Sequence, residues 1–315
     1  TEDQVRVARY RKVTSRGRQA VQLVFDRTPF YAESGGQTGD RGFIEAGKEK
    51  IIITDTVREN NLIIHIASAV PDDPSLTFKA AVDAEARQDT ANNHSATHLM
   101  HHALREVLGK HVEQKGSLVT PDRLRFDFSH FRQVTPEEIS SVEEKVNSMI
   151  MQNIVSEVHD DTPIEEALSM GAMALFGEKY GEKVRVVTFG DSVELCGGTH
   201  VDRTSRIGLF KIVSEGAVAA GVRRIEAVTG RKAISFINEK LSILDEVTAM
   251  LRSTGNPVAN ISKLMTENAT LKGTIEKLQA SAALSARNEL AARAETAGNC
   301  RIYSGVLEET GADTL

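Results

Sequence analysis

Two short segments about a hundred residues apart constrain the fold most strongly, because together they hold a complete set of zinc ligands. His94 and His98 stand four positions apart in residues 93–99, whose sequence is NHSATHL. On a helix this spacing places both imidazoles on one face. Cys196 and His200 bracket the second segment, CGGTH. One thiolate and three imidazoles suit tetrahedral zinc, so we expect the fold to join the two segments around one Zn2+ ion.

The same residues leave other chemistries open. Cys196 and His200 alone can form a nucleophilic thiol–imidazole pair. Ser95 stands where the HExxH metalloproteases carry their general base, so that class of enzyme is not expected. Four protein ligands usually close a zinc site, which favours a structural ion unless a ligand leaves or the coordination expands. The sequence does not decide between a structural and a catalytic metal.

The apolar residues from Ala84 to Leu108 recur with the helical period, which predicts that His94 and His98 lie on one helix. Gly109 follows as a C-terminal cap. The stripe that this helix buries comprises Ala96, Leu99, Met100, Ala103, Leu104 and Val107.

Residues 1–88 are predicted to form a small β-barrel or sandwich, because short β-branched runs alternate with turn residues. The clearest runs are 5–7, 20–25, 51–53 and 62–66. Between two of them, residues 28–42 hold Gly35, Gly36, Gly39 and Gly42, which predicts a loop whose backbone amides can approach a ligand closely. A tight turn at the barrel rim explains the glycines equally well, and no Gly-Lys-Ser/Thr follows to make a P-loop.

Residues 89–230 are predicted to form an α+β domain, with an antiparallel sheet and separate helices. Thr135 and Thr162 each precede a proline and two glutamates, which predicts that each caps a helix. Strands are expected at 116–119, 124–128, 154–158, 184–189, 192–195, 207–213 and 224–228.

Residues 231–298 are predicted to be a helical dimerisation or spacer region, with one helix over 231–252 and a longer one to about 297. A heptad seam on the second helix favours either an internal hairpin or a coiled-coil dimer equally. Its members are Leu264, Asn268, Leu271, Ile275, Leu278 and Ala282. Residues 299–315 look like the start of a truncated C-terminal domain.

The composition indicates where the protein works and which classes of protein it does not belong to. Only Cys196 and Cys300 occur in 315 residues, which excludes a disulfide framework and favours a cytoplasmic location. No apolar run is long enough for a transmembrane helix, and the polar start lacks a signal peptide and an initiator Met, so we expect a soluble fragment. The net charge of −6 argues weakly against extensive nucleic-acid binding. Basic residues nevertheless gather as Arg6, Arg9, Arg11, Lys12, Arg16 and Arg18, and as Lys115, Arg123, Arg125, Arg223 and Arg224. They form either a solvated surface or a face for one end of an RNA.

Several motifs, taken in order along the chain, resemble alanyl-tRNA synthetase in the half that follows its aminoacylation domain. They are residues 28–42, 93–99, 114–117, 125–129, 196–200 and 221–226. Free-standing alanyl-tRNA editing proteins share the barrel and the metal motifs. The editing domain of threonyl-tRNA synthetase shares only the metal motifs and is thought to work without a bound metal. The resemblance implies a threonyl/alanyl-type editing domain over residues 89–230.

The resemblance also implies an activity and a set of site residues. The activity is hydrolysis of serine or glycine wrongly esterified to alanine tRNA. His94, His98, Cys196 and His200 are then the zinc ligands, Thr97 and Gln114 the catalytic residues, and Lys115, Arg223, Gly35, Gly36 and Gln37 the contacts to tRNA or substrate. Thr97 is expected to hydrogen-bond the serine hydroxyl and Gln114 to position substrate or water. The intact enzyme would charge the tRNA with alanine in the missing domain, using ATP and Mg2+. Alternatives are a free-standing trans-editing deacylase, or a tRNA-binding and dimerisation module with structural zinc.

Overall fold

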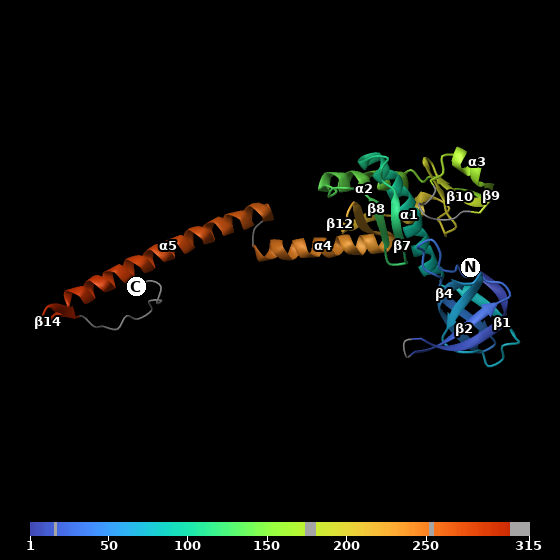
Figure 1. Cartoon of the computed structure of the whole chain (residues 1–315), viewed down its shortest axis with the longest axis horizontal. Helices are drawn as coiled ribbons and strands as arrows, with labels where there is room; N and C mark the ends of the chain where they lie inside the picture. The colour runs from blue at the N-terminus through green and yellow to red at the C-terminus, as the bar shows by residue number, and fades with distance from the viewer. Residues whose placement is uncertain (16–17, 174–180, 252–254, 303–315) are drawn as a thin grey trace. The chain divides into compact units, whose positions relative to one another are not determined.

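The computed structural model describes residues 1–15, 18–173, 181–251 and 255–302 (Figure 1). The chain divides into two units, Thr1–Ile237 and Asn238–Leu315. The first unit holds a barrel and two further sheets, and the second consists mainly of helix. The α+β class predicted from the sequence is confirmed.

The first six strands close into a barrel, and the sandwich alternative is thereby excluded (Figure 1). Neighbouring strands pair antiparallel, in the order β1-β2-β5-β4-β3-β6. Alternate side chains point inward and fill the interior, with Leu23, Ile44 and Phe78 fully buried. The strands are β1 (Glu2–Ser15), β2 (Arg18–Phe25), β3 (Gly42–Ala46), β4 (Glu49–Glu59), β5 (Leu62–Ala67) and β6 (Thr77–Val82).

One histidine lies fully buried in this barrel. His65 Nδ1 is 3.2 Å from the carbonyl oxygen of Leu23, which can only accept, so Nδ1 carries the proton and Nε2 accepts from the Thr28 hydroxyl at 2.8 Å. The ring packs against Phe25, with ring centroids 4.1 Å apart. Burial lowers the pKa of His65 to about 4, and the hydrogen bond to Leu23 offsets only part of that shift.

We expect the first unit to lose stability in acid because of His65. In the unfolded chain the imidazole binds a proton near pH 6.5, whereas in the fold it does so only near pH 4. The unfolded state therefore holds more protons in this window, so the stability present above pH 6.5 falls by about 3 kcal/mol on acidification to pH 4. Urea unfolding of the parent protein and of His65→Gln, above pH 6.5 and at pH 4, measures this loss of stability. The difference between the two proteins should shrink in acid, whereas His159→Gln, at an exposed position, should show no such change; a constant difference for His65→Gln would contradict the account.

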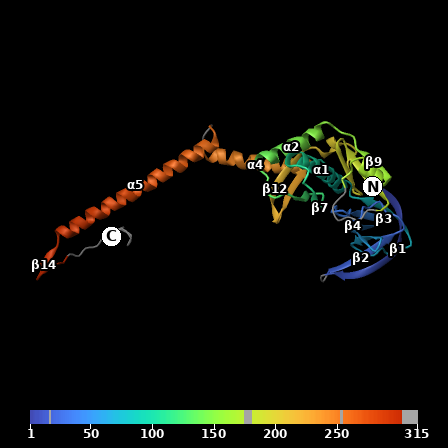
Figure 2. The same ribbon diagram turned by 45° about the horizontal axis from the view of Figure 1, so that its top comes forward.

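The helix α1 (Ala84–Leu108) follows the barrel and has the bounds that the sequence predicts. Asp83 caps its first turn by accepting from the Ala86 amide at 3.0 Å, and Gly109 ends it with φ of 117°. Its predicted apolar stripe is buried, with Val107 partly so. The helix packs on a four-stranded sheet of order β12-β13-β8-β7 (Figure 2). This sheet comprises β7 (Gln114–Val119), β8 (Leu124–Ser129), β12 (Phe210–Ala219) and β13 (Val222–Thr229).

The first unit also contains one long helix, one short helix and a small sheet. Thr135 caps α2 (Pro136–Met151) through a capping box with Glu138, as expected. The small sheet has the order β11-β10-β9 and leads directly into Cys196. Its strands are β9 (Glu157–Pro163), β10 (Lys183–Phe189) and β11 (Ser192–Leu195), and α3 (Ile164–Ser169) lies between β9 and β10 in sequence.

Three local predictions for the first unit were wrong. The strand expected at 154–158 starts instead at Glu157, because Val155 makes only an isolated bridge to Arg203. Thr162 does not cap α3; it lies in β9, and its hydroxyl donates to the carbonyl of His159 at 3.3 Å. The strand expected from residue 207 starts at Phe210, after the 3-10 turn η1 (Thr204–Ile207).

The second unit holds the end of α4 (Gly230–Met250), then α5 (Pro257–Ala292), which Asn256 caps. The short strands β14 (Glu295–Ala297) and β15 (Cys300–Ile302) follow, so α5 stops before the predicted residue 297. The apolar seam residues Leu264, Leu271, Ile275 and Leu278 are exposed, and their pairing with another helix stays a prediction. Residues 252–254 and 303–315, which include parts of the predicted helix break and of the truncated domain, lie outside the described residues. Within the described ranges, no helix has the length and apolarity needed to cross a membrane.

Candidate metal centre

The two predicted half-sites meet in the first unit. His94 and His98 lie on consecutive turns of α1 with ring centroids 5.3 Å apart, and both are almost fully buried. Cys196 directly follows β11, and the next four residues return His200 to the same point. One ligand atom from each of the four residues lies within 4.8 Å of every other. The structure therefore brings together the four residues predicted to bind zinc.

The donor set fits a tetrahedral zinc ion. Cys196 Sγ lies 3.4 Å from His94 Nε2 and 3.2 Å from His200 Nε2. His98 Nδ1 is buried and has no hydrogen-bond partner among the described residues, so this nitrogen is available to bind a metal. Burial, reinforced by neighbouring positive charge, lowers the pKa of His94 and of His200 well below the ordinary value. Both rings are therefore neutral near pH 7, which is the form that binds metal.

The turn between Cys196 and His200 requires a residue without a side chain at position 198. A Cβ atom on Gly198 would lie 2.1 Å from His94 Cε1, a distance that backbone and ring cannot both accommodate. Ser95, one residue after the first ligand, supports the same turn. Its hydroxyl oxygen accepts from the amide of Val201 at 3.1 Å and lies 3.1 Å from His200 Nδ1.

The glycine-rich loop of the barrel reaches this centre. Its backbone pairs with the end of β7, since the Val119 amide donates to Gly36 at 2.7 Å and the Thr38 amide donates to Val119 at 3.0 Å. A Cβ atom on Gly36 would lie 2.4 Å from the carbonyl oxygen of Ser117, so only glycine permits this approach. The loop is therefore more than a turn at the barrel rim, because it forms part of the site.

A cavity of about 90 Å³ opens beside the cluster. Two walls come from α1 and β7, where Thr97 and Gln114 line the space together with Ser117. The barrel loop supplies Tyr31, Ser34 and Gly35. The remaining lining residues are His94, His98, Glu194, Leu195, Cys196, Gly197 and Gly198.

The sequence did not single out five of these lining residues, one of which, Leu195, directly precedes Cys196. Tyr31 and Ser34 belong to the glycine-rich loop, so the loop itself was the signal for them. Ser117 lies within a motif that resembled the family, whereas only its place two residues before Cys196 could have pointed to Glu194. The Tyr31 hydroxyl donates to the carbonyl of Ser34 at 3.1 Å, and burial, followed by the negative charge of Cys196, raises its pKa to about 12.

Of the five residues predicted to contact tRNA or substrate, Gly35 lines the cavity, whereas Gly36 and Gln37 of the same loop, Lys115 and Arg223 do not. Lys115 Nζ is 3.0 Å from a carboxylate oxygen of Glu113, and Arg223 binds both carboxylate oxygens of Glu215 at 2.6 Å. Neither basic residue lines the cavity. Their contact with tRNA stays a prediction.

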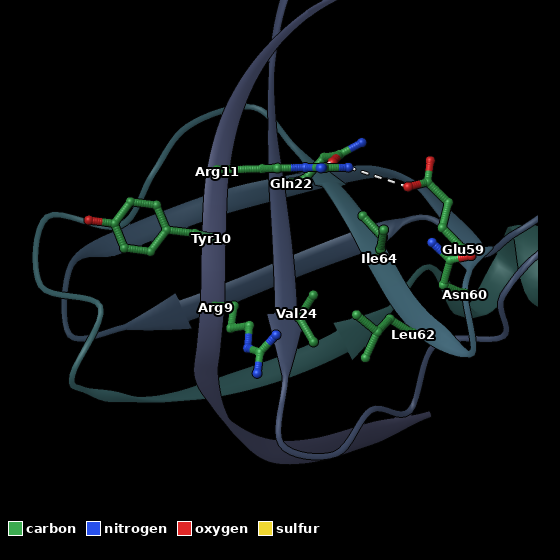
Figure 3. A pocket seen from close by; sticks show the side chains of 9 residues that line it. All are labelled: Arg9, Tyr10, Arg11, Gln22, Val24, Glu59, Asn60, Leu62 and Ile64. Carbon is green, nitrogen blue, oxygen red and sulfur yellow. Dashed lines mark hydrogen bonds and ion pairs between the residues drawn. The ribbon is translucent and has the colours of Figure 1, made fainter.

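A second hollow, of about 300 Å³, lies on the outer face of the barrel (Figure 3). Arg11 crosses it and contacts Gln22 at 2.5 Å and Glu59 at 3.3 Å. Arg9 and Arg11 of the basic cluster in the first segment line this hollow, and Arg16 lies outside the described residues. The lining residues are Arg9, Tyr10, Arg11, Gln22, Val24, Glu59, Asn60, Leu62 and Ile64, and they include no histidine or cysteine.

Comparison with known proteins assigns the two ends of the first unit. Residues 184–226, which include Cys196 and His200, match the family described as "Threonyl and Alanyl tRNA synthetase second additional domain". Residues 4–89, which include the barrel, match "tRNA synthetases class II (A)".

Curated relatives cover nearly the whole chain. Alanine–tRNA ligase of Parabacteroides distasonis is 47% identical over 305 residues, which are 97% of this chain and 35% of the relative. The ligase of Bacteroides fragilis is 52% identical over 276 residues, covering 88% of this chain and 32% of the relative. The ligase of Cytophaga hutchinsonii is 47% identical over 312 residues, covering 98% of this chain and 36% of the relative. The chain thus spans about a third of the length of these relatives. These relatives are 47–52% identical to this chain over nearly its whole length, and two family models of tRNA synthetases match parts of it. This chain therefore belongs to the alanyl-tRNA synthetase family.

Proposed function

We propose that this chain is the proofreading part of an alanine–tRNA ligase and hydrolyses the ester of serine or glycine misattached to alanine tRNA. The observation that supports this most is that Thr97 and Gln114 line the same small cavity as His94, His98 and Cys196, three of the four clustered residues that could hold a metal. A synthetic pocket sized for alanine cannot exclude glycine by size and rejects the extra hydroxyl of serine only weakly. Charging with alanine, using ATP and Mg2+, would belong to the rest of such a ligase.

The residues of the cavity have distinct tasks in this proposal. His94, His98, Cys196 and His200 would hold zinc, which supplies a Lewis acid for the ester when bound. Thr97 donates its hydroxyl to the carbonyl of Asn93 at 2.8 Å, so its oxygen lone pairs remain able to accept from a serine hydroxyl. Alanine offers no such donor, and this difference selects the serine ester over the alanine ester. Gln114, which lines the same cavity from β7, would orient the carbonyl or the attacking water.

The donor set favours metal-assisted hydrolysis over a cysteine nucleophile. A thiol–imidazole pair needs one histidine, and three surround Cys196. Burial also keeps His200 neutral by lowering its pKa, which disfavours the imidazolium partner of a reactive thiolate. Activity that survives complete removal of zinc would reverse this preference.

Hydrolysis of mischarged tRNA tests the proposal. We expect the zinc-loaded protein to release serine from seryl-tRNA(Ala) well above the rate in buffer and to leave alanyl-tRNA(Ala) nearly intact. Radiolabelled amino acid retained on the tRNA measures both rates. Serine release no faster than in buffer would reject the function, and equal release of both amino acids would reject the proposed selection.

Thr97→Val should weaken serine release selectively. The substitution keeps the volume of the side chain but leaves the serine hydroxyl without an acceptor, which costs about 1–3 kcal/mol. We expect serine release to fall about 10- to 100-fold and glycine release to fall much less. Thr90→Val is the matched control, because Thr90 is buried on the same helix and its hydroxyl likewise donates one turn back, to Ala86 at 2.8 Å. Equal losses on both esters, or equal losses in both variants, would contradict the role of Thr97.

A further inference from the structure

Gln37, in the glycine-rich loop of the barrel, is fully buried between the two halves of the metal cluster. Its side-chain amide makes three hydrogen bonds, and all three go to the metal centre. Oε1 lies 2.7 Å from His94 Nδ1 and 2.9 Å from the Thr199 amide nitrogen, and Nε2 donates to the Thr199 hydroxyl at 2.9 Å. Gln37 thus joins α1 to the turn that carries Cys196 and His200.

The backbone of Thr199 fixes the orientation of this amide. A backbone N–H can only donate, so the Gln37 atom that it contacts must be the oxygen. The same oxygen can only accept from His94, so Nδ1 of His94 carries the ring proton. His94 Nε2 then holds the lone pair, and this is the nitrogen that faces Cys196 Sγ at 3.4 Å. The tautomer of this ligand follows from hydrogen-bond geometry alone.

We propose that Gln37 is a positioning residue that fixes the tautomer and the ring orientation of His94 for zinc binding. The inference rests on the proposed metal centre and adds to it a residue from the barrel loop. Histidines that bind metals commonly donate their second N–H to such an acceptor, and loss of the acceptor lowers metal affinity by about 10- to 100-fold. The barrel would thereby complete the metal site.

Close packing around Gln37 supports the inference. A Cβ atom on Gly198 would lie 2.4 Å from His94 Nδ1 and 2.9 Å from Gln37 Oε1, so the bond between them is enclosed and shielded from water. His200 has a less definite partner, because the Ser95 hydroxyl beside its Nδ1 can either donate or accept. Of these two contacts, only the one to Gln37 dictates a single tautomer.

Zinc affinity of three glutamine variants tests the proposal. Gln37→Leu removes the acceptor and keeps much of the volume, whereas Gln37→Glu keeps an oxygen for both His94 and Thr199. Gln133→Leu alters an exposed glutamine and is the control. Competition with a chelator measures the zinc dissociation constant, and the visible bands of the cobalt-loaded proteins report the ligand geometry. Urea unfolding of the metal-free proteins separates metal binding from folding.

We expect Gln37→Leu to bind zinc about 10- to 100-fold more weakly and to change the cobalt spectrum, with Gln37→Glu restoring both. Equal weakening by Gln37→Leu and Gln37→Glu would show a packing role and overturn the inference. The inference would also be overturned if Gln37→Leu bound zinc as tightly as the parent protein. The same holds if the loss of zinc-binding free energy in Gln37→Leu equalled its loss of unfolding free energy without metal. A parent protein that binds no zinc would instead refute the metal centre itself, so the two failures are distinguishable.

Discussion

Replacing Cys196 with alanine should abolish stoichiometric zinc binding and, with it, the hydrolysis of seryl-tRNA(Ala). Cys196 Sγ is the one sulfur in the cluster and lies within 3.4 Å of two of the three imidazoles. Since loss of an outer acceptor already costs about 10- to 100-fold in affinity, loss of a direct ligand should cost more than 100-fold. When the free zinc concentration is a thousand times the dissociation constant of the parent protein, zinc binding stabilises the parent by about 4 kcal/mol, and the variant should lack this stabilisation.

Elemental analysis and urea unfolding with and without zinc measure these losses. Cys300→Ala is the matched control, because Cys300 is an exposed cysteine in β15 of the second unit. We expect this variant to retain the zinc content and the stability of the parent. Retention of one tightly bound zinc by Cys196→Ala would contradict the proposed ligand set.

Replacing Arg87 with methionine should destabilise the first unit by about 3–5 kcal/mol. Arg87, on α1, pairs through two nitrogens with Asp40, whose side chain is 5% exposed, and donates to the carbonyl of Pro29 at 3.0 Å. Asp40 also accepts from the Tyr31 amide at 2.5 Å, so this pair ties the barrel loop to the helix of His94. Removing only the arginine leaves a carboxylate buried without its partner, which is the costly case.

Urea unfolding of Arg87→Met at neutral pH measures the loss. Arg231→Met is the control, because Arg231 also pairs with acidic residues of α1 but is 65% exposed, where solvent screens an ion pair and its contribution to stability is small. Adding Asp40→Asn to Arg87→Met should recover part of the loss by removing the unpaired charge. A loss below about 1 kcal/mol for Arg87→Met would show that the buried pair does not hold the loop.

The parts of the fold that the sequence predicts correctly are those determined by nearby residues. The helix from Ala84 to Leu108 carries an apolar stripe at helical spacing and ends at a glycine, and both signals lie within the segment. Thr135 and Glu138 likewise define a helix start within four residues. The same logic fails at Thr162, because the cap pattern competes there with pairing to β10, a strand about twenty residues further along the chain.

The convergence of His94, His98, Cys196 and His200 could be predicted because these residue types are rare and paired, whereas their surroundings depend on contacts between distant segments. Gln37 could be singled out only as part of a glycine-rich loop, since its partners lie 57 and 162 residues away. Arg223 appeared available for tRNA because its bidentate pairing with Glu215 arises only when β12 and β13 align. Charge and glycine content thus indicate a site, but the tertiary fold decides what each side chain contacts.

X-ray absorption at the zinc edge of the purified protein tests the central claim most directly. We predict one zinc per chain with a single sulfur at about 2.3 Å and nitrogen ligands at about 2.0–2.1 Å. The sulfur contribution should disappear in Cys196→Ala and persist in Cys300→Ala. A spectrum fitted by oxygen and nitrogen alone, or one unchanged by Cys196→Ala, would show that Cys196 does not bind the zinc and would contradict the proposed four-residue metal centre.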